Sequence, residues 1–185
     1  MTGYTIRPAH PRDLPHLQPI ERAAASLFVE AGIGGTISVM PLADLEAACA
    51  AGGLLVAASA GAPVGFAVFS VAGAVAHLDE MDVHPDHGRR GLGTRLLHAV
   101  LDAARQRGCA AATLTTYRDL PWNRPFYERN GFETVPEEAW TPDMARHAAA
   151  EGVRPGSGRV VMVADLCATP RGGGRQRPAA AGPSG

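Results

Sequence analysis

Three glycines and two arginines lie close together in the segment HPDHGRRGLG. A strand-like run ends before this segment near Val83, and a helix-like run begins within it at Gly91 or Leu92. The first N–H groups of a helix have no partner within the helix, and the helix dipole favours negative charge at that end. Glycine lacks the Cβ atom that would keep an anion away from these groups, and Arg89 and Arg90 add permanent positive charge. The segment therefore predicts a phosphate or pyrophosphate site made mainly of backbone.

Three alternative roles for these glycines fit the sequence less well. A nucleoside triphosphate loop has the pattern GxxxxGK[ST], and its lysine is absent here. A dinucleotide loop reads GxGxxG, whereas these glycines run in the reverse order, and the acidic residue expected about 20 positions later has its nearest candidate, Asp102, inside a helix. A plain turn without a ligand needs only one or two glycines and gains nothing from paired arginines.

Acidic side chains and a histidine come just before this segment, in the strand-like run AVAHLDEMDV. Successive side chains of a strand point to opposite faces, so His77, Asp79 and Met81 share one face unless a bulge shifts the alternation. Glu80 and Asp82 then lie on the other face. Three acids within four positions favour a functional group of residues, while a solvated strand face stays open for each of them singly.

The surrounding sequence alternates between strand and helix patterns. Strands are expected at residues 4–9, 54–60, 61–71, 74–83, 111–117, 132–135 and 159–166. Helices are expected from about residue 13 to residue 28 and at residues 40–53, 93–108, 122–131 and 141–152. This order predicts one mixed α/β domain over residues 1–167 with a central sheet. Residues 168–185 have nothing to bury, and we expect a flexible C-terminal tail there.

Composition and charge exclude several classes of function. The chain of 185 residues is 46% hydrophobic and 19% charged, as in ordinary globular domains, and its net charge of −1 gives no field for nucleic acid. No apolar run approaches the roughly 20 residues that span a bilayer, and the N-terminus lacks a secretory signal pattern. The scattered cysteines form no pair, so we expect a cytoplasmic protein without nucleic-acid or membrane partners. His84 and His87 have no third ligand near them in sequence, so no metal is expected.

Two motifs resemble the GNAT superfamily of N-acetyltransferases. The segment LDEMDVHPDHGRRGLGTRLL resembles its acyl-CoA-binding motif, in which Val83 and Pro85 match the strand end and Gly91 and Gly93 match the loop. The segment NRPFYERNGF resembles its second motif, in which a tyrosine, here Tyr127, stands four residues before a Gly-Phe pair. Two motifs in the right order make this resemblance specific.

The resemblance covers nearly the whole chain without its tail and implies both a fold and a cofactor. The fold is a mixed, mostly antiparallel central sheet flanked by helices, and the cofactor is acetyl-CoA or coenzyme A. The strand that ends at Val83 is expected to splay from its neighbour and to pair with the pantetheine through the main chain of Met81, Asp82 and Val83. The family's asparagine position is Leu120 here, and Asn123 is the nearby residue that would contact the pantetheine.

The same resemblance implies how the pyrophosphate is held. It would lie on the backbone N–H groups at the start of the long helix, namely those of Arg89, Arg90, Gly91, Leu92, Gly93 and Thr94. The glutamine or arginine that the family carries three positions before Gly91 is Gly88 in this sequence.

The implied reaction is transfer of an acetyl group from a thioester to an amine. An ammonium ion has no free lone pair, so a base must remove a proton before the attack. The family pattern favours Asp79 or His77 as this base, and Glu80 would help to hold a substrate cation. Tyr127 would protonate the leaving thiolate or stabilise its charge, and the N–H of Met81 would stabilise the oxyanion.

The acceptor is less sharply indicated. Tyr117 and Trp122 come just before Tyr127 and would edge the acceptor site, and Glu30 would belong to the opposite wall. The acids favour a small-molecule amine, either a cationic amine or a polyamine; a protein N-terminus, a lysine side chain, an amino acid or an amino-bearing antibiotic stays open. A non-catalytic acyl-CoA-binding module is the alternative class, although it would have no use for Tyr127 and the acids. A homodimer is one form compatible with the family.

Overall fold

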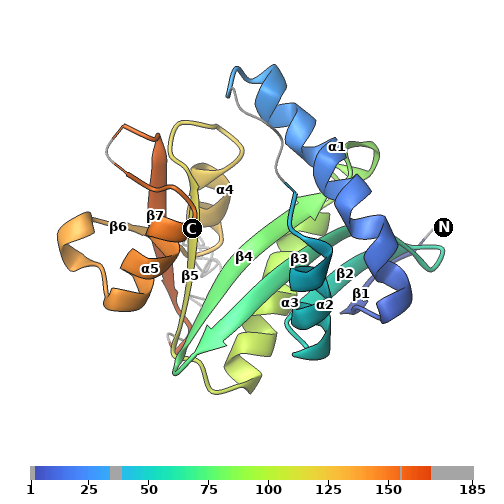
Figure 1. The fold of residues 1–185 in the computed structure, drawn as a ribbon, viewed down its shortest axis with the longest axis horizontal. Coiled ribbons are helices and arrows are strands. Elements are labelled where there is room, and N and C mark those ends of the chain that lie inside the picture. Colours follow the sequence, from blue (N-terminus) through green and yellow to red (C-terminus); the bar gives the residue numbers. More distant parts are fainter. Residues whose placement is uncertain (1–2, 34–38, 155, 168–185) are drawn as a thin grey trace, which may run out of the picture.

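The computed structural model describes residues 3–33, 39–154 and 156–167 (Figure 1). Its strands are β1 (Tyr4–Pro8), β2 (Leu54–Ser59), β3 (Ala62–Ala72), β4 (Val75–Val83), β5 (Ala111–Tyr117), β6 (Glu133–Val135) and β7 (Arg159–Asp165). Its α-helices are α1 (Leu17–Glu30), α2 (Leu42–Ala50), α3 (Leu92–Gln106), α4 (Arg124–Arg129) and α5 (Pro142–Ala150). Short 3₁₀ helices at Pro11–His16, Pro85–His87 and Glu137–Ala139 add to the elements expected from sequence. The expected tail, residues 168–185, lies outside the described residues.

The seven strands form one sheet in the order β1-β2-β3-β4-β5-β7-β6. Every neighbouring pair is antiparallel except β4 and β5, which run parallel. The prediction of a mixed, mostly antiparallel sheet flanked by helices is thereby confirmed. Within the described residues, no helix is both long and apolar enough to cross a bilayer.

Helices cover both faces of the sheet and enclose a core on each. α3 lies behind the sheet in Figure 1, whereas α1 and α2 lie in front of it. The apolar stripe of α3, with Leu96 and Leu97 fully buried, packs against one face. Leu17 of α1 and Leu45 of α2 pack against Phe66 on the other face. Burial of such stripes is the main source of stability for these amphipathic helices.

The parallel pair at the centre of the sheet separates halfway along its length. β4 and β5 pair only from Val75 to Leu78 on β4, although β4 continues to Val83. Beyond Leu78 the two strands diverge, and Figure 1 shows them as the two arms of a V. The separation leaves the main chain of β4 without a partner on the β5 side. The splayed strand expected from sequence is therefore present.

A β-bulge changes which side chains of β4 share a face. Glu80 pairs with Val68 and Leu78 with Phe69, so Asp79 is the extra residue between them. Leu78 belongs to the core beneath α3, and Met81 packs against the same core. The simple alternation that grouped Met81 with His77 is therefore wrong, because the bulge shifts the count by one. Glu80 and Asp82 lie instead on the α1 side of the sheet, together with His77.

Candidate active site

Two adjoining cavities open where β4 and β5 separate. The first, of about 450 Å³, lies among α1, β4, β5 and the start of β7, and we call it the acidic cavity because its lining includes Glu21, Asp79, Glu80, Asp82 and Glu151. The second, of about 490 Å³, follows the end of β4 and the start of α3, and we call it the glycine-loop cavity. Both cavities are lined by Phe28, Met81, Asp82, Asn123 and Tyr127. Ligands in the two cavities would therefore meet at this shared wall.

The glycine-loop cavity contains most of the residues expected to bind the cofactor. Its lining includes Met81, Asp82, Val83, Arg89, Gly91, Leu92, Gly93, Thr94 and Asn123. Gly91 is the N-cap of α3 and has a φ of 74°, in the left-handed region that glycine adopts most readily. Arg89 has a φ of 54°, which is uncommon for a residue with a side chain. Such strained backbone is concentrated at functional sites.

The side chain of Arg90 does not line the glycine-loop cavity. Its Nη1 donates to the Tyr4 hydroxyl at 2.7 Å, and its Nη2 donates to the Asp86 carbonyl at 3.3 Å. The backbone turns at Arg89, so the two neighbouring guanidinium groups do not face the same cavity. Of the two arginines expected to add positive charge at the helix start, only Arg89 lines the glycine-loop cavity, whereas Arg90 binds Tyr4 of β1. His87 lines the cavity instead, with its Nδ1 3.0 Å from the Tyr4 hydroxyl oxygen.

Three carboxyl groups gather on the α1 side of the acidic cavity. Glu21, Glu80 and Asp82 each offer an oxygen, and these oxygens lie within 4.8 Å of one another. Burial, reinforced by the charge of Glu21, raises the pKa of Glu80 to about 7. Burial and then the charge of Glu80 raise the pKa of Asp82 well above its ordinary value, and burial raises that of Glu21. Glu80 is therefore poised to take up or release a proton near neutral pH.

The carboxylate of Glu80 also accepts a hydrogen bond from the main-chain N–H that we expected to stabilise an oxyanion. The Met81 N–H donates to Glu80 Oε1 at 3.0 Å. This N–H lies on the side of β4 that has no β5 partner. A carbonyl oxygen that took this position would free the Glu80 carboxylate.

The carboxyl cluster is expected to make the protein less stable as the pH rises. The pKa of Glu80 is 4.5 in its ordinary state and about 7 in the folded protein, so the unfolded chain loses this proton at a lower pH. Between these values the folded state binds more protons, and the free energy of unfolding falls until the pH passes the folded-state pKa. We expect a decrease of about 1–3 kcal/mol between pH 5 and pH 8, measured by denaturant unfolding. Glu80→Gln should show a smaller decrease, and equal slopes in the two proteins would contradict this account.

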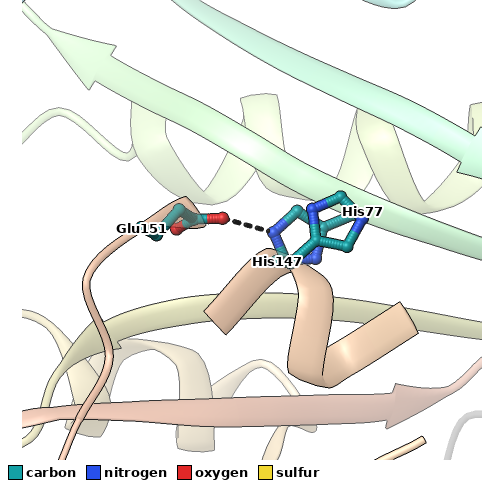
Figure 2. A group of neighbouring side chains, drawn as sticks. All are labelled: His77, His147 and Glu151. Atoms are coloured by element: carbon teal, nitrogen blue, oxygen red, sulfur yellow. Dashed lines mark hydrogen bonds and ion pairs between the residues drawn. The ribbon is translucent and has the colours of Figure 1, made fainter. Parts of the chain in front are cut away.

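His77 does not line either cavity. It is 3% exposed, with Nδ1 2.8 Å from Thr113 Oγ1 and Nε2 2.8 Å from Glu151 Oε1. Figure 2 shows its ring against that of His147, with centroids 3.7 Å apart and planes 16° apart. Both ring nitrogens are thus engaged, and direct removal of a proton from an amine in the acidic cavity is not supported for His77. Nearly parallel rings also do not direct their nitrogens toward one point, as ligands of one metal ion would.

Two of the three residues expected around the acceptor lie elsewhere. Tyr117 does line the acidic cavity, with its ring 5.6 Å from that of Phe28. Trp122, 46% exposed, lies at the glycine-loop cavity instead. Glu30 is exposed and lines neither cavity. It comes nine residues after Glu21, about two and a half helical turns, and therefore lies on the opposite face of α1.

Tyr127 lies at the wall shared by the two cavities. Its ring makes edge-to-face contacts with Phe126 and Phe132, with centroids 5.0 and 5.8 Å away. Burial, followed by the charges of Glu80 and Asp82, raises the pKa of Tyr127 well above its usual value. The hydroxyl therefore keeps its proton at neutral pH and can donate a hydrogen bond.

Three residues of the acidic cavity were not singled out from sequence: Glu21, Glu151 and Arg159. Glu21 had a detectable signal, because it falls at helical spacing among Leu17, Ile20 and Ala24 on the buried stripe of α1. A carboxylate on such a stripe is unusual unless it has a partner or a function. Glu151 follows α5 and Arg159 begins β7, and no local pattern distinguishes either.

A splayed parallel strand pair, with a glycine-rich loop opening the helix that follows, defines an acyltransferase of the coenzyme A-dependent class. Residues 23–132 match the acetyltransferase (GNAT) family, and the chain belongs to that family. Its cofactor is accordingly acetyl-CoA, as the motif resemblance implied.

Solved structures show the same fold. PaiA N-acetyltransferase from Thermoplasma acidophilum, in complex with coenzyme A, is 17% identical, with a TM-score of 0.70 over 88% of this chain and 99% of that one. The ribosomal-protein-S18-alanine N-acetyltransferase from Escherichia coli is 21% identical, with a TM-score of 0.60 over 91% and 97%. N-acetylglutamate synthase from Neisseria gonorrhoeae, complexed with coenzyme A and N-acetyl-glutamate, is 20% identical, with a TM-score of 0.68. That match covers 90% of this chain but only 36% of the synthase.

Proposed function

We propose that the protein transfers the acetyl group of acetyl-CoA to the primary amine of a small molecule by direct attack. The observation that carries this proposal is the wall shared by the two cavities. A thioester reaching it from the glycine-loop cavity would meet an amine in the acidic cavity, beside Met81 and Tyr127. The size of the acidic cavity, about 450 Å³, favours a small acceptor over a protein segment.

The cofactor would be held mainly by main chain. The pantetheine would pair with β4 from Met81 to Val83, where β5 has diverged, as an added strand. The pyrophosphate would lie on the N–H groups between Arg89 and Thr94, where Gly91 opens α3. Asn123 lines both cavities and is the side chain we assign to the pantetheine near the thioester.

Glu80 is the base that we assign to the reaction. It removes one proton from the bound ammonium, the amine nitrogen attacks the thioester carbon, and the new C–N bond forms as the C–S bond breaks. The nitrogen gives up its second proton as the amide forms, and the departing sulfur takes up a proton and leaves as the thiol. A pKa of about 7 suits this role, because the base must be ionised at working pH and still accept a proton. The arriving thioester carbonyl would take the Met81 N–H and free the carboxylate that now accepts from it.

Asp79 is the less favourable base. It accepts a hydrogen bond from the Ser70 hydroxyl at 3.3 Å, and it lies at the bulge, next to the last paired residues of β4 and β5. It does line the acidic cavity, so Asp79→Asn is the comparison for any test of Glu80.

Tyr127→Phe is expected to lower kcat by about 10²-fold with little change in acetyl-CoA affinity. The hydroxyl would donate a hydrogen bond that stabilises the charge on the departing sulfur, whereas the ring packing on Phe126 and Phe132 survives in the variant. Thiol release from acetyl-CoA with an amine panel measures the first effect, and calorimetric titration with coenzyme A measures the second.

The same assay separates an enzyme from a binding module. Wild-type protein that binds acetyl-CoA but releases no thiol with any amine would favour the non-catalytic alternative. A Tyr127→Phe variant as active as wild type would remove Tyr127 from the mechanism while leaving the transfer reaction in place.

A further inference from the structure

Two buried polar atoms of opposite charge lack partners in the wall of the acidic cavity. Within the described part of the chain, three buried side-chain nitrogens or oxygens make no hydrogen bond, and two of them are Glu21 Oε2 and Arg159 Nε. Both residues line the acidic cavity, Glu21 from α1 and Arg159 from the start of β7. Since buried polar atoms are nearly always satisfied, each such exception needs an explanation. A bound ligand with a donor at one end and an acceptor at the other would provide one.

The guanidinium of Arg159 is fixed in place from one side only. Its Nη2 donates to Thr115 Oγ1 at 2.6 Å and to Glu151 Oε2 at 3.3 Å. Its central carbon lies 5.0 Å from the centroid of the Tyr117 ring, so the group also stacks on an aromatic wall. The bonds to Thr115 and Glu151 thus orient the guanidinium while Nε stays without a partner.

The carboxylate of Glu151 is held by His77 and Arg159. Thr113 Oγ1 lies 2.8 Å from His77 Nδ1 and 3.4 Å from the Ala76 carbonyl oxygen. The Glu151 carboxylate can only accept, so His77 Nε2–H donates to it in the contact drawn in Figure 2.

The pKa of Glu151 agrees with this arrangement. Burial alone would raise it, but the hydrogen bonds from His77 and Thr115 hold it below its ordinary value. One ionised carboxylate therefore stands between His77 and Arg159, and Arg159 brings a permanent positive charge to this end of the cavity. The α1 end of the cavity is acidic, because the carboxyl groups of Glu21, Glu80 and Asp82 lie there.

We infer that the acceptor is an amino acid, that is, a primary amine that also bears a carboxylate. Its amino group would lie at Glu21, Glu80 and Asp82, and its carboxylate would bind the guanidinium of Arg159. This inference rests on the proposed acetyl transfer and narrows its acceptor. It also replaces the sequence-based expectation of a wholly cationic amine or polyamine.

A carboxylate fits Arg159 better than other groups do. A second ammonium would face the permanent positive charge of the Arg159 guanidinium. Nη2 of Arg159 is already engaged by Thr115 and Glu151, so Nε–H is the donor left to give a carboxylate a charge-assisted hydrogen bond. His77 is then a positioning residue, because it fixes Glu151, which in turn orients Arg159.

The test is a panel in which each amino acid is paired with the amine that lacks its carboxylate. The panel contains β-alanine with ethylamine, γ-aminobutyrate with propylamine, α-amino acids with their decarboxylated amines, and putrescine and spermidine as cationic acceptors. For the wild type we expect kcat/KM to be about 10- to 100-fold higher for the best amino acid than for its paired amine. Arg159→Met should bring this ratio close to one, mainly through KM, and Arg159→Lys should restore part of it. Arg118→Met is the matched control, since Arg118 is exposed and paired with Asp119, and it should keep the wild-type ratio.

The possible results separate this inference from the proposed function. Acetylation of plain amines or polyamines as fast as of any amino acid would overturn the amino-acid acceptor while supporting acetyl transfer. A wild-type preference that survives Arg159→Met would overturn the role of Arg159. If none of the acceptors in the panel leads to thiol release, the proposed function is overturned, and this inference with it. The wild-type comparison decides the matter even if Arg159→Met fails to fold.

Discussion

Glu80→Gln is expected to lower kcat for amine acetylation by about 10²- to 10⁴-fold. The amide keeps the size of the carboxylate, and its oxygen can still accept from the Met81 N–H. It cannot take a proton from the bound ammonium, so the nucleophile stays protonated. Because the variant also loses one charge from the Glu21, Glu80 and Asp82 cluster, its folding is not expected to suffer. Steady-state thiol release with saturating acetyl-CoA measures the effect.

The pH dependence gives the second readout for Glu80. In the wild type, kcat/KM should rise with pH through about 7, as the carboxyl loses its proton, and then level off. This rise should disappear in Glu80→Gln. Asp79→Asn is the control, with an expected loss under about tenfold and a retained pH profile. A larger loss in Asp79→Asn than in Glu80→Gln would transfer the role of base to Asp79.

Gly91→Asp is expected to reduce acetyl-CoA affinity at least about 100-fold, because it adds a carboxylate among N–H groups that would bind the pyrophosphate. A Cβ added at Gly91, the N-cap of α3, would meet no atom within 4 Å. The effect would therefore come from charge and from backbone conformation, not from a clash. Calorimetric titration with coenzyme A measures it.

Gly91→Asn separates those two contributions. Asparagine has the shape of aspartate, and both tolerate the left-handed conformation that Gly91 adopts at φ 74°. Asn should therefore cost a similar conformational energy without the negative charge, and we expect its affinity to stay within about tenfold of wild type. Equal affinities for the Asp and Asn variants would show that no anion binds at this helix start.

Local sequence patterns were sufficient for much of the fold. The stripe of Leu96, Leu97, Val100 and their neighbours repeats at the helical period, and burying that stripe leaves α3 only one way to face the sheet. The glycines before Leu92 indicate where that helix starts, because they favour the backbone conformation found there. This preference depends only on the residue types at a few neighbouring positions. Such features are short-range, so a single sequence reveals them.

Contacts between distant segments were not accessible in this way. The bulge at Asp79 depends on how β4 meets β3, and it alone decides that Glu80 and Asp82 share a face with His77. Glu21 joins these acids only because α1 crosses the open end of β4 and β5, although its place on a buried stripe gave a hint.

The sequence by itself therefore determined the class of fold, the family and the glycine-rich loop that opens α3, because each follows from neighbouring residues. Only the tertiary structure decided which side chains surround the reacting groups. It turned Arg90 toward Tyr4, carried Glu30 to the outer face of α1, and brought Glu151 and Arg159 to the acidic cavity from segments far along the chain. Side-chain direction at a cavity depends on packing between elements, and that packing has no signature in local spacing.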